Sequence, residues 1–140
     1  MSLLKVLDIS GTGMSAQSVR LNTTASNLAN ANNVSSNLEQ TYKSRQPVFA
    51  AEFNRAREGL DSSSVGVQVL GIVESTAELK NEYAPNHPKA DKDGFIYHSN
   101  VNVMEEMANM ISASRSYQTN VQIADAAKQM LSRTLQMGKG

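Results

Sequence analysis

Apolar residues recur near both ends of the chain at alternating steps of three and four. Near the N-terminus the series reads Leu4, Leu7, Gly11, Met14, Ser18, Leu21, Ala25, Leu28 and Asn32. Near the C-terminus it reads Val103, Met107, Met110, Ser114, Tyr117, Val121, Ala124, Lys128, Leu131 and Leu135. This spacing is typical of a heptad seam on a helix. It predicts one long helix at each end, and the C-terminal seam is the more regular of the two.

The C-terminal helix has recognisable ends. Asn102 is a good N-cap, and Glu105 and Glu106 fall in the first turn, where the helix dipole favours anions and accounts for both. The far end carries Arg133, Gly138 and Lys139. We therefore expect a helix over 103–137, about 52 Å long, which exceeds the diameter of a compact globule of this size. Such arms have to pair with each other or with other chains.

The middle of the chain follows a different pattern. All three prolines lie there, and valines alternate with Gly and Gln over 65–73, which predicts a strand with a bend or bulge at a glycine. A second short strand is expected at 95–97, after the turn signal at 91–94. Residues 62–64 and 83–92 look like loops.

These patterns predict an α+β fold with three parts. Residues 1–41 form an N-terminal helical arm, 42–99 a small and mostly β middle domain, and 100–140 a C-terminal heptad arm. The two terminal helices are expected to pair in the manner of a coiled coil.

Charge and composition exclude several classes of protein. Thirteen Lys and Arg balance thirteen Asp and Glu, so we expect no nucleic acid as a partner. There are no cysteines, which excludes disulfides and thiolate chemistry. No apolar run is long enough to span a bilayer and no cleavable signal pattern is present, so we expect no direct membrane insertion.

The N-terminal arm is almost uncharged, since Arg20 is the single charged residue from Ile9 through Leu38. A helix with one solvated face normally carries Lys and Glu there. One interpretation is a helix surrounded by other subunits, where a charge would be costly to desolvate. The other is a weak, partly disordered arm, because Asn, Ser, Thr and Gly are poor helix formers. Both hold if the arm becomes ordered on assembly.

The sequence offers no candidate active site. The two histidines, His87 and His98, form no metal-binding pair and suit hydrogen-bonding roles better. The Asp91-Lys92-Asp93-Gly94 segment fails as a calcium loop, because Lys89 and Asn100 fall where carboxylates are needed. Phosphate-binding, dinucleotide and nucleophile motifs are absent. We therefore predict no catalytic residues, no metal and no cofactor, and a protein that is not an enzyme.

Several segments resemble one family. The segment 25–30 reads A-S-N-L-A-N and is similar to the N-terminal signature of the flagellar rod, hook and hook-associated proteins. The resemblance continues through 15–22, 42–45, 47–49, 83–91, 94–97, 100–107 and 114–120. It covers essentially the whole chain, and the short middle segment fits the proximal-rod members of the family best.

The resemblance implies a structural subunit of the bacterial flagellar basal body, in the rod that crosses the periplasm and transmits torque. It also implies export through the flagellar type III apparatus without a cleaved signal. The implied partners are FlgB, FlgF, FlgG, FliE and further copies of the chain itself. The alternative is a soluble helical adaptor or export chaperone of the flagellar system that binds a partner helix in its own heptad groove.

We predict that the assembly interface lies along the two seams and uses asparagines that hydrogen-bond between neighbouring helices. Its expected residues in the N-terminal arm are Leu7, Met14, Leu21, Asn27, Leu28 and Asn30. In the C-terminal arm they are Val103, Met107, Met110, Tyr117, Asn120, Val121, Ala124, Leu131 and Leu135.

Overall fold

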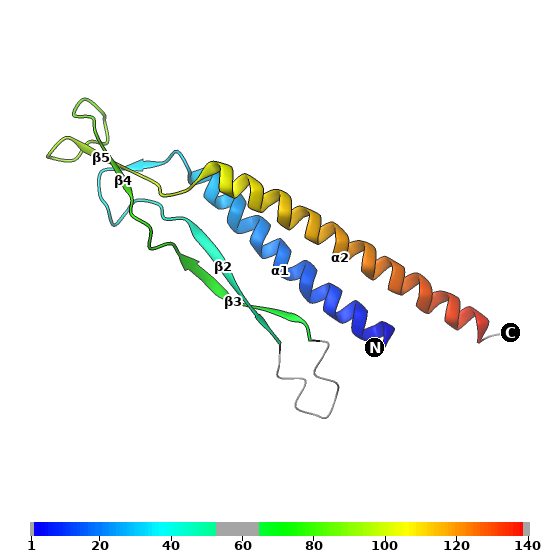
Figure 1. Cartoon of the computed structure of the whole chain (residues 1–140). Coiled ribbons are helices and arrows are strands. Elements are labelled where there is room, and N and C mark those ends of the chain that lie inside the picture. Colours follow the sequence, from blue (N-terminus) through cyan, green and yellow to red (C-terminus); the bar gives the residue numbers. More distant parts are fainter. Residues whose placement is uncertain (1, 53–64, 139–140) are drawn as a thin grey trace.

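The computed structural model describes residues 2–52 and 65–138, so the predicted loop at 62–64 and Lys139 lie outside the described residues. Two long helices lie side by side, and the strands run along one flank and across one end of the pair (Figure 1). The helices are α1 (Leu3–Asn30) and α2 (Val103–Met137). The strands are β1 (Val34–Ser35), β2 (Arg45–Ala51), β3 (Val67–Glu74), β4 (Lys80–Tyr83) and β5 (Phe95–His98). The predicted α+β class is confirmed.

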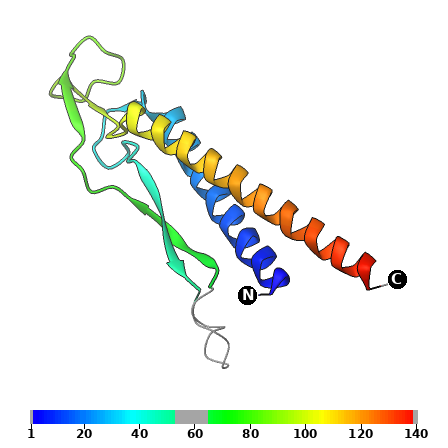
Figure 2. The ribbon, with the colours of Figure 1, turned by 45° about the vertical axis from the view of Figure 1, so that its right-hand side comes forward.

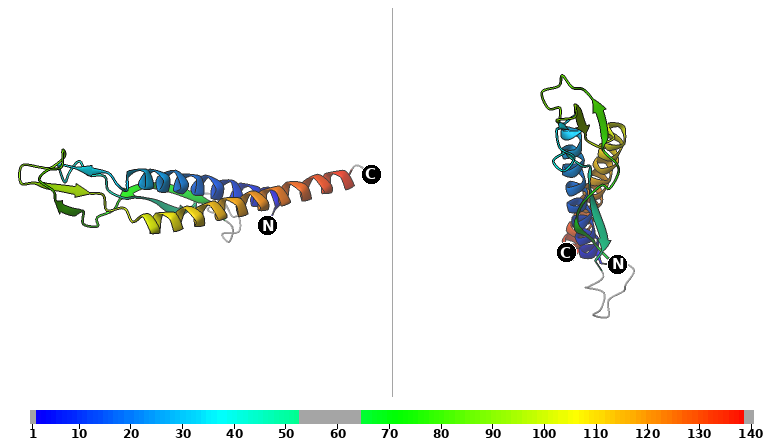
Figure 3. Two further views of the ribbon diagram at one scale, coloured as in Figure 1. Left: turned by 90° about the horizontal axis from the view of Figure 1, so that it is seen from above. Right: turned by 90° about the vertical axis from the view of Figure 1, so that its left-hand side faces the viewer.

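The two helices run antiparallel (Figures 1 and 3). Arg20 Nη2 on α1 donates a hydrogen bond to Asn109 Oδ1 on α2 at 2.9 Å. Nearer the start of α1, a Cβ added to Gly13 would lie only 3.0 Å from Asn120 Nδ2, so the backbone of α1 comes close to this side chain. The last turns of α2 reach beyond the first residue of α1 (Figure 3).

Small side chains rather than leucines fill the contact between the helices. Ala16 on α1 and Ala113 and Ala127 on α2 are buried. Leu7 and Leu21, which belong to the predicted seam of α1, are only half-buried. Closely approaching helix backbones leave room for small residues only, and the bulkier seam residues therefore lie at the margins of the contact.

The ends of α2 agree with the sequence at one terminus and differ at the other. Asn102 Oδ1 accepts hydrogen bonds from the Met104 and Glu105 amides at 3.2 and 3.5 Å, which confirms it as the N-cap. Gly138 occupies the C-cap with φ −80°, so the helix ends without a left-handed glycine. The last turn of α2 carries no basic residue.

Strands β2 and β3 form an antiparallel ribbon that lies along α1 (Figures 1 and 2). The pairing Val48 with Gly71 is followed by Phe49 with Val69, which leaves Leu70 as an extra residue on β3. This bulge beside Gly71 confirms the irregularity expected there. Strand β2 was not predicted, because Pro47 interrupts its pattern.

A second sheet, of order β1-β5-β4, caps the end of the helix pair. Strand β5 was predicted from 95–97, and Gly94 before it adopts φ +84°, as the turn signal required. Strand β1 places Val34 and Ser35, from the predicted N-terminal arm, opposite His98 and Tyr97 of β5. Strands β1 and β4, of two and four residues, were not predicted, because they are short and lack the preceding turn signal and the apolar run that identified β5.

Candidate assembly interface and the junction behind it

The helix pair and the strands are joined at a junction centred on Asn27 of α1, whose side chain is only 1% exposed. Asn27 Oδ1 accepts hydrogen bonds from the Arg45 amide at 3.0 Å and from the Tyr42 hydroxyl at 2.9 Å. Its Nδ2 donates to the Arg45 carbonyl at 2.8 Å. The side chain thus pairs with the backbone of β2 as a neighbouring strand would, and fixes the start of the ribbon on α1.

Ser44 extends the junction to α2. Its amide donates to Asn100 Oδ1 at 2.7 Å, and its hydroxyl lies 3.5 Å from Glu106 Oε1. Glu106 is only 4% exposed, whereas Glu105 beside it is exposed. The helix dipole alone therefore does not explain Glu106, because this carboxylate is also buried against Ser44, the residue just before β2.

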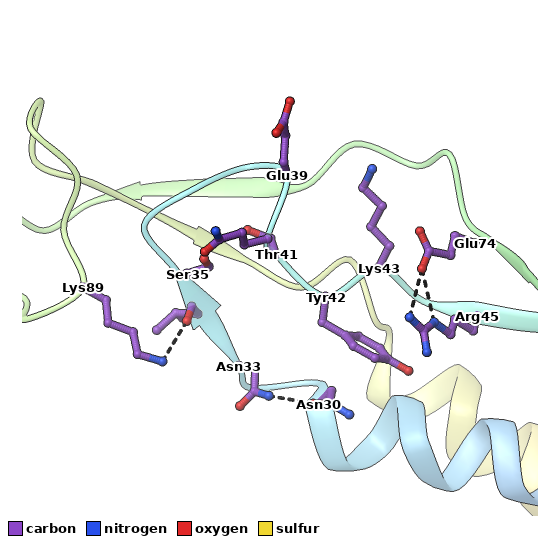
Figure 4. Close-up of a pocket in the computed structure, with 12 residues that line it drawn as sticks. Asn30, Asn33, Ser35, Glu39, Thr41, Tyr42, Lys43, Arg45, Glu74 and Lys89 are labelled. Atoms are coloured by element: carbon purple, nitrogen blue, oxygen red, sulfur yellow. Dashed lines mark hydrogen bonds and ion pairs between the residues drawn. The ribbon is translucent and has the colours of Figure 1, made fainter.

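A polar groove of about 490 Å³ opens beside the junction, between the end of α1, the segment 39–45 and Lys89 (Figure 4). Arg45 forms an ion pair with Glu74 at 3.1 Å on its wall, and its guanidinium lies 5.4 Å from the centre of the Tyr42 ring. Lys89 Nζ donates to the Val34 carbonyl at 3.1 Å. These groups are engaged in structural contacts, and this groove holds no histidine or aspartate for proton transfer.

The turn before β5 is organised by Asp91. Its Oδ1 accepts hydrogen bonds from the Phe95 amide at 2.8 Å and the Asp93 amide at 2.9 Å, and the Tyr97 hydroxyl donates to Oδ2 at 3.3 Å. The Phe95 hydrogen bond is the main cause that holds the pKa of Asp91 below its ordinary value. Desolvation raises the pKa of Tyr97, and the charge of Asp91 adds to that effect. The segment is thus a turn, as predicted.

The histidines have the hydrogen-bonding roles that the sequence favoured. His87 Nδ1 accepts from the Lys89 amide at 3.1 Å, and His98 Nε2 lies 2.9 Å from Glu82 Oε2. Over residues 2–52 and 65–138, no group of three or more His, Cys, Asp and Glu is arranged to hold a metal ion. No helix in this part of the chain has the length and apolar character needed to cross a membrane.

Of the nine predicted interface residues of α2, four are exposed and five are half-buried. Exposed among them are Val103, Met107, Tyr117 and Leu135. Half-buried are Met110, Asn120, Val121, Ala124 and Leu131. The second group borders α1, and the first group extends the apolar surface away from it.

The predicted residues of α1 are divided differently. Leu7, Met14, Leu21 and Leu28 are half-buried beside the helix contact. The side chains of Asn27 and Asn30 bond within their own chain: Asn30 Nδ2 donates to the Ser26 carbonyl and Asn30 Oδ1 accepts from Asn33. Both asparagines therefore differ from the expectation of hydrogen bonds to a neighbouring helix, because the turn and strand after α1 use them first.

Several exposed apolar residues of α2 were not among the expected interface residues: Met104, Ile111, Ile123, Met130 and Met137. A heptad template selects one face of a helix, so exposed apolar residues on its other sides are not selected. The role of Ser44 and Arg45 was missed too, although both lie in a segment that carried the family resemblance.

Comparison with known proteins identifies the group to which these features belong. A family model described as "Flagella basal body rod protein" matches residues 7–37, and one described as "Flagellar basal body rod FlgEFG protein C-terminal" matches 92–137. The chain is 42% identical over 139 residues to the flagellar basal-body rod protein FlgC of Salmonella typhimurium, which covers 99% of this chain and 100% of the relative. It is 43% identical, with the same coverage, to FlgC of Escherichia coli O157:H7.

The chain belongs to the FlgC family of flagellar basal-body rod proteins. Like FlgC, it is a structural subunit of the rod in the flagellar basal body. The family match confirms the resemblance seen in the sequence and favours a rod subunit over a soluble adaptor. It also implies assembly with other components of the basal body.

Proposed function

We propose that this FlgC-family chain builds the proximal rod by packing its helix pair against neighbouring subunits, without a catalytic step. The observation that supports this most is the apolar surface that α2 leaves uncovered, which includes Met107, Ile111 and Leu135. Met107 and Ile111 are one helical turn apart, and Leu135 lies far along the same helix, so exposed apolar side chains occur along much of α2. Extensive exposed apolar surface on a folded chain marks a protein contact. Burying it between subunits would stabilise the rod by roughly 25 cal/mol for each Å² removed from water.

The neutral surface of α1 supports the same role. Arg20, the single charge from Ile9 to Leu38, already bonds to Asn109 of its own chain. Over residues 9–30 a second helix can therefore approach α1 without desolvating a further charge, which would cost several kcal/mol. On this proposal, Leu7, Met14, Leu21 and Leu28 complete their burial against a neighbour, while Asn27 acts indirectly by holding the ribbon in place.

The three parts of the chain have different tasks in this proposal. Residues 1–41 and 100–140 supply the packed and stiff arms that transmit torque, and 42–99 faces outward. The proposed neighbours are FlgB, FlgF, FlgG, FliE and copies of the same chain, after passage through the flagellar type III export apparatus.

The first test is deletion of the gene, followed by imaging of basal bodies and scoring of motility. Rings and export apparatus without rod, hook and filament are expected. Intact rods would contradict the proposal. Recovery of the protein only in the cytosol, and never with purified basal bodies, would favour the soluble adaptor.

A matched pair of variants tests the exposed surface of α2. Met107→Asp is expected to abolish rod assembly, because it places a charge in the apolar surface, while the helix dipole tolerates an acid near the N-terminus of α2. Ser112→Asp places the same charge on a different, exposed face and is expected to swim normally. Motility of the Met107→Asp strain would remove this surface from the interface.

A further inference from the structure

The β2–β3 ribbon has one face over the helices. Antiparallel pairing puts Phe49 and Val69 on the same face, and it puts Pro47 and Ile72 there as well. Pro47 and Phe49 line a groove of about 380 Å³ together with Arg20 of α1. This inner face therefore packs toward the helix pair, as the ribbon's course along α1 also indicates (Figure 2).

The opposite face of the ribbon is uncharged and exposed. Val48 and Val73 lie on it together with Gln46 and Gln68, and Val73 is 52% exposed. Leu70, the extra residue of the bulge, is 63% exposed. The ribbon carries no charged residue over 46–51 and 67–73. Apolar side chains on both faces of a ribbon favour a sheet that is covered on both sides, and a two-stranded ribbon alone is marginally stable.

Charge indicates which surface fits this outer face. From Ser15 to Ala29 the exposed face of α1 is neutral and consists of Ser15, Ser18, Asn22, Ala25 and Ala29, while the charged Asp8 lies on the same face nearer the N-terminus. The exposed surface of α2 carries Glu105, Arg115, Asp125, Lys128 and Arg133. Covering those charges with an uncharged ribbon would desolvate them without compensation, whereas the neutral face of α1 imposes no such cost.

We propose that the outer face of the ribbon packs against the exposed face of α1 in a second copy of this chain. The proposal rests on the proposed rod function. It extends a contact that the chain already makes, since Thr12 Oγ1 of α1 accepts a hydrogen bond from the Val67 amide at 3.2 Å within one molecule. In the rod, each ribbon then lies between two α1 helices, its own on the inner face and a neighbour's on the outer face.

The chain lacks cysteine, so disulfide cross-linking can test this directly. Two copies with different tags are expressed together in the deletion strain, one with Val73→Cys and the other with Ser18→Cys. Basal bodies are isolated and oxidised, and dimers that carry both tags are detected. A second pair, Leu70→Cys with Ala25→Cys, is run in parallel. The control pairs Val73→Cys with Gln122→Cys, an exposed position on α2.

We expect a cross-linked dimer that carries both tags for at least one of the two pairs that join the ribbon to α1. The control pair with Gln122→Cys should give no such dimer. Single-cysteine chains that enter motile rods but give no two-tag dimer in either pair would overturn this inference and leave the rod function intact. A dimer only with Gln122→Cys would overturn it in favour of α2 as the partner surface. Failure of the wild-type chain to enter basal bodies would instead contradict the proposed function itself.

Discussion

At the scale of single residues, Asn27 shows how one side chain joins the separate parts of the chain. It is buried on α1, yet its hydrogen bonds go to Tyr42 and Arg45, at the start of the ribbon. The sequence motif selected Asn27 as a residue that bonds between neighbouring helices, whereas within this chain its partners are Tyr42 and Arg45. A sequence motif identifies a residue but not its hydrogen-bond partner. The partner of Asn27 depends on the path of the segment that follows α1, and this path has no periodic pattern in the sequence.

Replacing Asn27 tests the junction. Asn27→Ala leaves the Arg45 amide and carbonyl without their partner in a buried position, and should lower the free energy of unfolding by roughly 2–4 kcal/mol. Urea denaturation of the purified chain measures this. Asn22→Ala, on the exposed face of the same helix, is the control and should change stability by no more than about 0.5 kcal/mol. Equal effects of the two substitutions would show that the junction contributes nothing specific.

Asp91 makes the turn before β5 sensitive to acid. Its pKa is lowered in the folded chain, mainly by the Phe95 amide, so its stabilisation is present above the ordinary value of 3.8. It is lost as the pH falls through the lower folded value. We expect the Phe95 amide to exchange faster with solvent below that point, which NMR-detected hydrogen exchange measures.

Asp91→Asn provides the matching control. It keeps an oxygen acceptor but removes the charge that helps to raise the pKa of Tyr97. The pKa of Tyr97 should therefore move back toward its ordinary value of 10.0, and an NMR titration of the ring would detect the change. An unchanged Tyr97 pKa would mean that the two side chains do not interact as described.

At the scale of elements, the long helices were predictable and the way they meet was not. The bounds 103–137 for α2 followed from Asn102 and a seam that only Ser114 and Lys128 interrupt. The contact itself uses Ala16, Ala113 and Gly13, which have no amphipathic signal because small residues occur on every face. Strands β1 and β4 were missed for the same kind of reason, since they are too short to show a period.

Substitutions at two glycines of α1 distinguish the effect of helix packing on stability from the effect of helix propensity. A Cβ added at position 13 would lie only 3.0 Å from Asn120 Nδ2. The larger side chain of Gly13→Leu should therefore force the two helices apart. The expected loss is roughly 1–3 kcal/mol of unfolding free energy, as for other overpacked contacts. Gly11→Leu meets nothing within 4 Å at its Cβ and should instead gain a few tenths of a kcal/mol or more from helix propensity. Thermal unfolding followed by circular dichroism distinguishes the two; a stabilised Gly13→Leu would contradict the close helix contact.

At the scale of the whole molecule, the shape is elongated because the described part of the chain has no large hydrophobic core around which its elements pack. The buried apolar residues in the described part of the chain are Ala16, Ile96, Ala113 and Ala127, and three of these four are alanines. The division into arms and middle segment was readable from periodicity, because each arm repeats one pattern. The proposed contact surfaces could not be predicted in full from the sequence, since the exposed apolar residues of α2 outside the expected interface and the outer face of the ribbon are identified only when the intramolecular contacts are known.

The unequal lengths of the helices lead to a prediction about assembly. Residues 132–137 of α2 extend past the start of α1 and are all exposed, with Leu135 63% exposed (Figure 3). Since this part of α2 touches little of its own chain, Leu135→Asp should change the unfolding free energy by less than about 0.5 kcal/mol. It should nevertheless reduce or abolish rod assembly, because a neighbour that covers Leu135 would have to bury the new carboxylate.

Gln129→Asp introduces the same charge at an exposed position on a different side of α2 and serves as the control. Purified basal bodies and swimming assays report assembly, and urea denaturation reports the stability of the isolated chain. Loss of rods with unchanged stability, seen for Leu135→Asp but not for Gln129→Asp, would show that the end of α2 is covered by another subunit. Normal swimming by Leu135→Asp would mean that this end stays in solvent inside the rod, and the proposed packing would then be confined to the part of α2 that runs beside α1.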